Sequence, residues 1–160
     1  MNLALTAPEW LAWALGALLV IAAAEDAYRL RISNITSIAV LVLSLVAMAV
    51  VGFSVSLWEN AVVFLLVLAI GTFLFGRGWL GGGDVKLLAA LGLWFDLDGA
   101  FRLILSVLIA GGILAIVILA MRMVTRGEGK RRVAVLNKGA GIPYGIAIAA
   151  GALFILALQR

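Results

Sequence analysis

The sequence has 160 residues, of which 66% are hydrophobic and only 12% are charged, and its formal net charge is +4 at pH 7. A soluble domain of this length exposes too much surface for that composition, whereas a lipid bilayer accommodates it readily. Histidine and cysteine are both absent, which excludes disulfides, thiolate nucleophiles, Ser-His-Asp triads and zinc sites of the usual kinds. Any hydrolytic chemistry must therefore use carboxylates, lysine, serine or threonine.

The apolar stretches are continuous rather than alternating, which favours membrane helices over a barrel. We expect an all-α integral membrane protein, one domain over residues 1–160, with about six transmembrane helices at approximately 10–25, 35–57, 61–75, 84–95, 101–121 and 140–158. Ser33 or Asn34 is a suitable N-cap for the second helix.

The fourth of these helices is short, because its length of about 18 Å is well below the ~30 Å of a hydrocarbon core. Either the helix crosses only partway, or the glycine-rich segment before it enters the membrane. Irregular backbone at that depth needs protein or water around it, so we expect a polar cavity near Asp84.

Basic residues predict the orientation of the chain. The connections after the first, third and fifth helices contain most of them, namely Arg29 and Arg31, Arg77 and Lys86, and six residues between Arg122 and Lys138. The opposite connections contain the acids Glu59, Asp96 and Asp98. The positive-inside rule therefore predicts both termini outside and the basic connections in the cytoplasm. For the same reason, the net positive charge does not indicate a nucleic-acid partner.

Two carboxylates are candidates for catalysis. Asp26 follows the first apolar run and Asp84 ends the cluster Gly81-Gly82-Gly83, so the predicted topology places both at the cytoplasmic face. Two carboxylates that share a proton can hydrolyse a peptide bond without metal or histidine. Because Asp84 is near a helix N-terminus and Asp26 near a helix C-terminus, we expect Asp84 to act first as the base and Asp26 to carry the proton. Taken alone, Asp84 is equally well interpreted as a helix-capping acid.

The glycine cluster has a mechanical interpretation. Side chains at Gly81, Gly82 and Gly83 would obstruct an extended substrate that approaches Asp84, and glycine also permits positive φ. We interpret Glu25 as an interfacial acid, and Lys86 as a lysine that extends to the lipid headgroups.

These segments resemble a known family. Gly81-Gly82-Gly83-Asp84 matches the Gly-x-Gly-Asp motif of the intramembrane aspartyl proteases, which include type IV prepilin peptidases, preflagellin peptidases and presenilins. The segment from Asp26 to Ile32-Ser33-Asn34 is similar to the first-aspartate segment of prepilin peptidases, with Ser33 in place of the usual proline. The Gly-Asp-Val-Lys-Leu continuation and Pro143-Tyr144-Gly145 resemble the short prepilin peptidases of Flp (tight-adherence) pilus systems.

The resemblance implies an aspartic endopeptidase of the bacterial cytoplasmic (inner) membrane. Its substrate would be a prepilin, cut between a short basic leader and the hydrophobic pilin helix, and its other partners would be membrane lipids. Asp26 and Asp84 would be catalytic, without a cofactor or metal. Pro143, Tyr144 and Gly145 would line the substrate groove, although a structural kink explains Pro143 and Tyr144 equally well. Larger members also methylate the new pilin terminus through a segment with paired cysteines, and since this chain has no cysteine we expect it not to do so.

Three alternatives remain. A preflagellin leader peptidase would use the same chemistry. A small proton- or cation-coupled transporter would use paired membrane acids as an ion relay, although no acid is expected at mid-depth. A non-catalytic assembly subunit would tolerate replacement of both aspartates.

Overall fold

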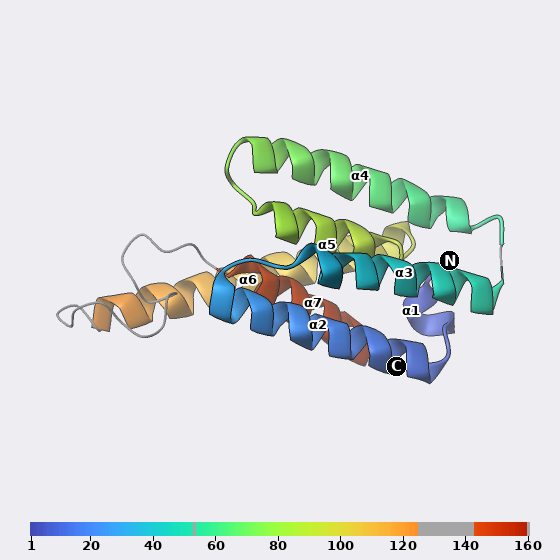
Figure 1. Ribbon diagram of the computed structural model, residues 1–160, viewed down its shortest axis with the longest axis horizontal. Coiled ribbons are helices and arrows are strands. Elements are labelled where there is room, and N and C mark those ends of the chain that lie inside the picture. Colours follow the sequence, from blue (N-terminus) through green and yellow to red (C-terminus); the bar gives the residue numbers. More distant parts are fainter. Residues whose placement is uncertain (53, 125–142, 160) are drawn as a thin grey trace.

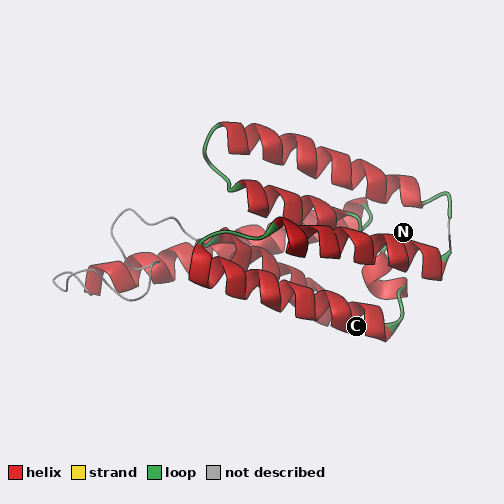
Figure 2. Cartoon of the chain, viewed as in Figure 1, coloured by secondary structure: helices red, strands yellow, loops and turns green. Residues whose placement is uncertain are grey.

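The computed structural model describes residues 1–52, 54–124 and 143–159. Within these residues the chain forms seven helices and no strand (Figure 2). The helices are α1 (Leu3–Thr6), α2 (Glu9–Arg29), α3 (Asn34–Val51), α4 (Leu57–Gly76), α5 (Gly82–Gly92), α6 (Leu97–Val124) and α7 (Tyr144–Leu158). Four of them, α2, α3, α4 and α6, are long and apolar enough to cross a membrane. The expected all-α membrane fold is confirmed at this level, while six crossings and their orientation stay predictions.

The short helix α5 is an inner element of the fold. It has 11 residues, so it is about 16 Å long, and it packs against α3, α4 and α7. Leu87 and Leu91 are fully buried, as are Trp94 and Phe95 in the turn that follows. Surrounding helices therefore cover a segment that is too short to cross a bilayer by itself.

The boundary between the second and third predicted helices is wrong. The second was expected to continue to residue 57, but α3 ends at Val51 and the chain turns at Gly52, where φ is +95°. Apolar residues continue past this point, so hydropathy does not reveal the break. The φ of +95° at Gly52 is one that a residue with a side chain adopts only with strain.

The third predicted helix starts too late for a different reason. Trp58, Glu59 and Asn60 were expected to form a turn, yet all three belong to the first turn of α4, which begins at Leu57. Asn60 is fully buried, and its Nδ2 donates to the carbonyl oxygens of Met1 at 3.0 Å and Leu93 at 2.9 Å. A polar residue near a helix start can thus be an inward-facing part of the helix.

The other predicted boundaries also differ from the structure. The predicted spans 10–25 and 101–121 lengthen to Glu9–Arg29 and Leu97–Val124, and the span 84–95 moves to Gly82–Gly92. Asp96 accepts a hydrogen bond from the Gly99 N–H at 2.9 Å, which stabilises the start of α6. The last helix begins at Tyr144, and the predicted start at 140 and the basic residues from 126 to 138 lie outside the described residues.

The helices are arranged so that their connections collect at two ends of the body (Figure 1). The α2–α3 connection, the α4–α5 connection and the start of α7 lie at one end. The α3–α4 connection and α1 lie at the other. Asp26 and Asp84 are therefore at the same end of the body, as the charge pattern predicted, and Asp96 is at the opposite end.

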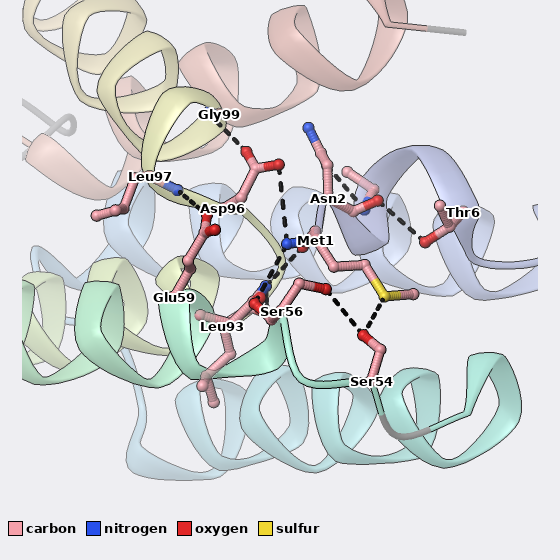
Figure 3. A network of polar contacts seen from close by, with 12 residues as sticks. Met1, Asn2, Thr6, Ser54, Ser56, Glu59, Leu93, Asp96, Leu97 and Gly99 are labelled. Atoms are coloured by element: carbon pink, nitrogen blue, oxygen red, sulfur yellow. Dashed lines mark hydrogen bonds and ion pairs between the residues drawn. The ribbon is translucent and has the colours of Figure 1, made fainter.

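A polar network closes the end opposite the two aspartates (Figure 3). The Met1 amino group donates to the Ser56 carbonyl oxygen at 3.4 Å and lies 3.9 Å from an Asp96 carboxylate oxygen. Leu3 in α1 is fully buried. This network binds α1 to the connection before α4 and to the turn before α6.

Close packing between α6 and α7 depends on Gly151. A Cβ atom at this position would lie 2.8 Å from the Val107 Cα and N atoms, whereas a Cβ at Gly112 would meet nothing within 4 Å. We expect Gly151→Ala to lower the free energy of unfolding in detergent by about 1–3 kcal/mol. Gly112→Ala is the matched control, and should be neutral or stabilising by up to ~1 kcal/mol. Equal unfolding free energies for both variants would contradict this packing.

Candidate active site

Asp26 is held by the start of a distant helix. It lies in the last turns of α2 and is only 4% exposed. Its Oδ2 accepts a hydrogen bond from the backbone N–H of Gly145, in the first turn of α7, at 2.6 Å. Pro143, the N-cap residue of α7, provides no side-chain cap. The Asp26 carboxylate thus provides the acceptor that this helix start requires.

The residues at the start of α7 have different roles. A Cβ at Gly145 would lie 2.9 Å from both Cβ and Oδ2 of Asp26 and 2.8 Å from Cδ1 of Ile32. Glycine is therefore required at position 145 so that the Asp26 side chain can lie this close to the start of α7. Pro143 is fully buried and precedes the helix, in keeping with a structural role. Tyr144 is 36% exposed and lines a cavity with Asp84.

Asp84 lies in the first turn of α5 and caps it. Its Oδ2 accepts a hydrogen bond from the Gly81 N–H at 3.2 Å. This bond satisfies one of the N–H groups that have no partner within the helix. The interpretation of Asp84 as a capping acid is therefore confirmed, and capping leaves the carboxylate at the wall of a cavity.

The glycine cluster allows close contacts rather than unusual backbone angles. The expectation of positive φ is wrong for Gly81, Gly82 and Gly83, since among the described glycines only Gly52 and Gly78 have it. A Cβ at Gly81 would lie 2.6 Å from Oδ2 of Asp84, and one at Gly83 would lie 2.9 Å from the Ile32 carbonyl oxygen. At Gly82 the nearest atom would be in the Phe75 ring, at 3.3 Å. Glycine is thus needed at Gly81, where the Asp84 carboxylate approaches the backbone, and at Gly83, where the α2–α3 connection approaches it.

Both aspartates line one cavity of about 330 Å³. The other lining residues are Leu30, Arg31, Ile32 and the three glycines from Gly81 to Gly83. The sequence thus predicted the polar cavity near Asp84, and the structure brings Asp26 and Asp84 together in it. In the described part of the chain, no group of three or more His, Cys, Asp or Glu residues is placed to hold a metal ion.

Leu30, Arg31 and Ile32 were not predicted as site residues. Leu30 ends α2 in the left-handed conformation, with φ +52°. This reverses the chain over the end of α2, so the next two residues line the cavity. The signal available in the sequence was the short connection itself, because a chain that links adjacent antiparallel helices must cross the end of the first.

The structure adds one influence to the assignment of the shared proton. Asp26 lies in the last turn of α2 and Asp84 in the first turn of α5, as expected. In addition, the Asp26 carboxylate accepts an N–H from the N-terminus of α7. Helix N-termini favour anions, so this contact opposes the effect of the α2 C-terminus on Asp26, and the assignment of the proton stays a prediction.

A second, largely apolar cavity of about 350 Å³ lies between α4, α5, α6 and α7. Its walls include Gly71, Leu88, Gly111 and Tyr144, and Asp84 lines it as well. Asp84 therefore lies between a polar cavity at the end of the body and an apolar cavity along the helices.

The comparison with known protein families agrees with the helical membrane fold described above. A family model described as the type IV leader peptidase family matches residues 13–119. This range covers more than half of the chain and includes both Asp26 and Asp84. The chain belongs to the type IV leader peptidase family. It matches no curated protein and no solved structure.

The contact between Gly145 and Asp26 generates a prediction for activity. In Gly145→Ala, the added methyl group must displace the Asp26 carboxylate or α7. A displacement of about 1 Å in a reacting group can cost on the order of 100-fold in rate, so we expect at least about a tenfold lower rate of leader-peptide cleavage. Cleavage of a purified precursor in detergent, followed by its shift in size, measures this.

Gly76→Ala is the matched control, because a Cβ at Gly76 would meet nothing within 4 Å. Its cleavage rate should stay within about twofold of wild type. A wild-type cleavage rate for Gly145→Ala would show that the placement of the Asp26 carboxylate does not depend on a glycine at position 145.

Proposed function

We propose that the protein is an aspartic leader peptidase that removes the leader from Flp-type prepilins, with Asp26 and Asp84 as its catalytic dyad. The observation that carries this proposal is that carboxylates from α2 and α5 line one cavity, although they are 58 positions apart in the sequence. The match to the leader peptidase family over this range supports it.

The chemistry requires one ionised and one protonated carboxyl group. The ionised carboxylate takes a proton from water, and the water oxygen attacks the scissile carbonyl carbon. The protonated carboxyl transfers its proton to the carbonyl oxygen as the bond to water forms, which gives a tetrahedral gem-diol intermediate. When the C–N bond breaks, the carboxyl that took a proton from water gives it to the leaving amine. A gem-diol hydroxyl returns its proton to the other carboxylate as the C=O bond re-forms. Neither carboxyl group is consumed, so the dyad returns to its starting state.

The two cavities at Asp84 support the proposed class of substrate. One is polar and at the end of the body, and the other is apolar and lies along the helices. A prepilin has a polar leader joined to an apolar helix, so its scissile bond lies at a boundary of the same kind. The proposed location of this end of the body is the cytoplasmic face of the inner membrane, in a six-helix topology with both termini outside.

We propose peptidase activity alone, without N-methylation of the product. Carboxylates suffice for the hydrolysis, and the chain contains no cysteine with which to build the segment associated with methylation in larger members.

Removal of either carboxyl charge should abolish cleavage. We expect Asp26→Asn and Asp84→Asn each to lower kcat by at least about 1000-fold, since members of a catalytic unit fail individually. The assay uses purified protein in detergent and a precursor with a basic leader, a glycine before the cleavage point and an apolar helix. Asp98→Asn is the matched control, because Asp98 is exposed, forms an ion pair with Arg102 at 2.7 Å, and lies in the first turn of α6, outside the cavity that the two aspartates line.

The same variants distinguish the alternatives. Efficient cleavage by either Asp26→Asn or Asp84→Asn would overturn the dyad. An inert wild-type protein that carries a proton or cation current in vesicles would instead indicate a transporter.

A shared proton also predicts the pH dependence of kcat. At low pH both carboxyl groups are protonated and no base remains, and at high pH both are ionised and no acid remains. The profile of kcat against pH should therefore be bell-shaped, with two limbs that belong to the pair. A profile with a single acidic limb and a flat plateau toward high pH would contradict a protonated partner.

A further inference from the structure

The start of α3 is hydrogen-bonded to α2 and to α5, the two helices that carry the proposed dyad, through Glu25 and Lys86. The segment Ile32-Ser33-Asn34 joins α2 to α3. It is hydrogen-bonded on one side to Glu25, which precedes Asp26, and on the other side to Lys86, which is two residues after Asp84.

Glu25 binds the segment to α2. Its Oε2 accepts hydrogen bonds from the Ser33 N–H at 3.0 Å and from the Thr36 hydroxyl at 2.8 Å. Ser33, one of the two residues predicted as the N-cap of α3, is the N-cap, and its Oγ accepts the Thr36 N–H at 3.1 Å. Glu25 is thus part of the cap of α3, which differs from its interpretation as an interfacial acid.

Lys86 binds the same segment to α5. Its Nζ donates to Oδ1 of Asn34, the first residue of α3, at 2.8 Å. Lys86 was interpreted as a lysine that extends to lipid headgroups, but its ammonium group has this partner within the protein.

Ile32 lies between the backbones that position the two aspartates. A Cβ at Gly83 would lie only 2.9 Å from its carbonyl oxygen, and a Cβ at Gly145 would lie only 2.8 Å from its Cδ1. Gly83 directly precedes Asp84, and Gly145 donates to Asp26. Ile32 is only 8% exposed, so it separates these two glycines as a buried spacer.

We propose that Ile32-Ser33-Asn34 is a brace that sets the separation of Asp26 and Asp84, and that Glu25 and Lys86 are positioning residues that hold it. The proposal rests on the proposed role of the two aspartates. The brace acts on the distance between the carboxyl groups, which matters most in the transition state, when both act on one carbonyl group and one water. Loss of the brace therefore lowers kcat and leaves KM nearly unchanged.

Matched substitutions test whether the acceptor and donor positions matter. Glu25→Gln and Thr36→Ser keep the hydrogen-bonding groups, whereas Glu25→Leu and Thr36→Val remove them. Lys86→Arg keeps a donor for Asn34, and Lys86→Met removes it. We expect the removing variants to lower kcat about tenfold or more, as for loss of a hydrogen bond to a charged group. The keeping variants should stay within about threefold of wild type, with KM unchanged throughout.

A distance measurement tests the brace without using activity. Because the chain has no cysteine, spin labels can be placed at Tyr28→Cys on α2 and Trp79→Cys before α5, both of which are exposed positions. In full-length protein in detergent, we expect the label distance distribution to shift or broaden in Glu25→Leu and Lys86→Met. It should remain as in wild type in Glu25→Gln and Lys86→Arg.

These measurements distinguish a failure of the proposed brace from a failure of the proposed dyad. Wild-type kcat and an unchanged distance distribution in Glu25→Leu and Lys86→Met would overturn the brace and leave the dyad intact. A changed KM with unchanged kcat would also overturn it, because it would assign these residues to substrate binding. Failure of the dyad is seen separately, as cleavage by Asp26→Asn or Asp84→Asn.

Discussion

The hydrogen bond between the Asp26 carboxylate and the Gly145 N–H joins residues that are 119 positions apart, and the site depends on it. A buried carboxylate is costly unless donors replace the water that it loses, and the free N–H groups at the start of α7 are such donors. The bond needs a glycine, since any Cβ at Gly145 would contact Asp26. This hydrogen bond therefore holds the start of α7 against the end of α2. Asp26 and the α2–α3 connection line one side of the cavity there.

The other side of the cavity also depends on glycines that permit close contacts. Gly81 and Gly83 lack side chains where Asp84 and the Ile32 carbonyl oxygen approach. Asp84 can consequently cap α5 and still line the cavity that contains Asp26. The two halves are then linked by a connection that Glu25 and Lys86 hold from opposite sides. Stability of the helix starts and geometry of the proposed catalytic pair thus depend on the same few backbone contacts.

Much of this arrangement could be predicted from local patterns, and the remainder depends on tertiary contacts. The long apolar runs predicted the helices, and the charges placed Asp26 and Asp84 at one end. The cap of α3 was narrowed to Ser33 or Asn34, and Ser33 is the one that caps it. The end of α3 at Gly52 was missed because apolar residues continue past it, and the start of α4 was missed because Asn60 is polar yet fully buried. The partners of Glu25 and Lys86 are 8 and 52 residues away in sequence, so no helical periodicity relates them.

The central claim of this account is that Asp26 and Asp84 form one coupled site. The most direct measurement is the titration of the Asp84 carboxyl carbon by NMR in protein with ¹³C-labelled aspartate, first in wild type and then in Asp26→Asn, with the signal assigned through Asp84→Asn. We predict that the titration curve of Asp84 changes when the Asp26 charge is removed, because the two carboxylates line one cavity and like charges in one site titrate as a coupled pair. The Asp98→Asn variant should leave the curve unchanged. An Asp84 curve that is identical with and without the Asp26 charge would contradict the coupled site.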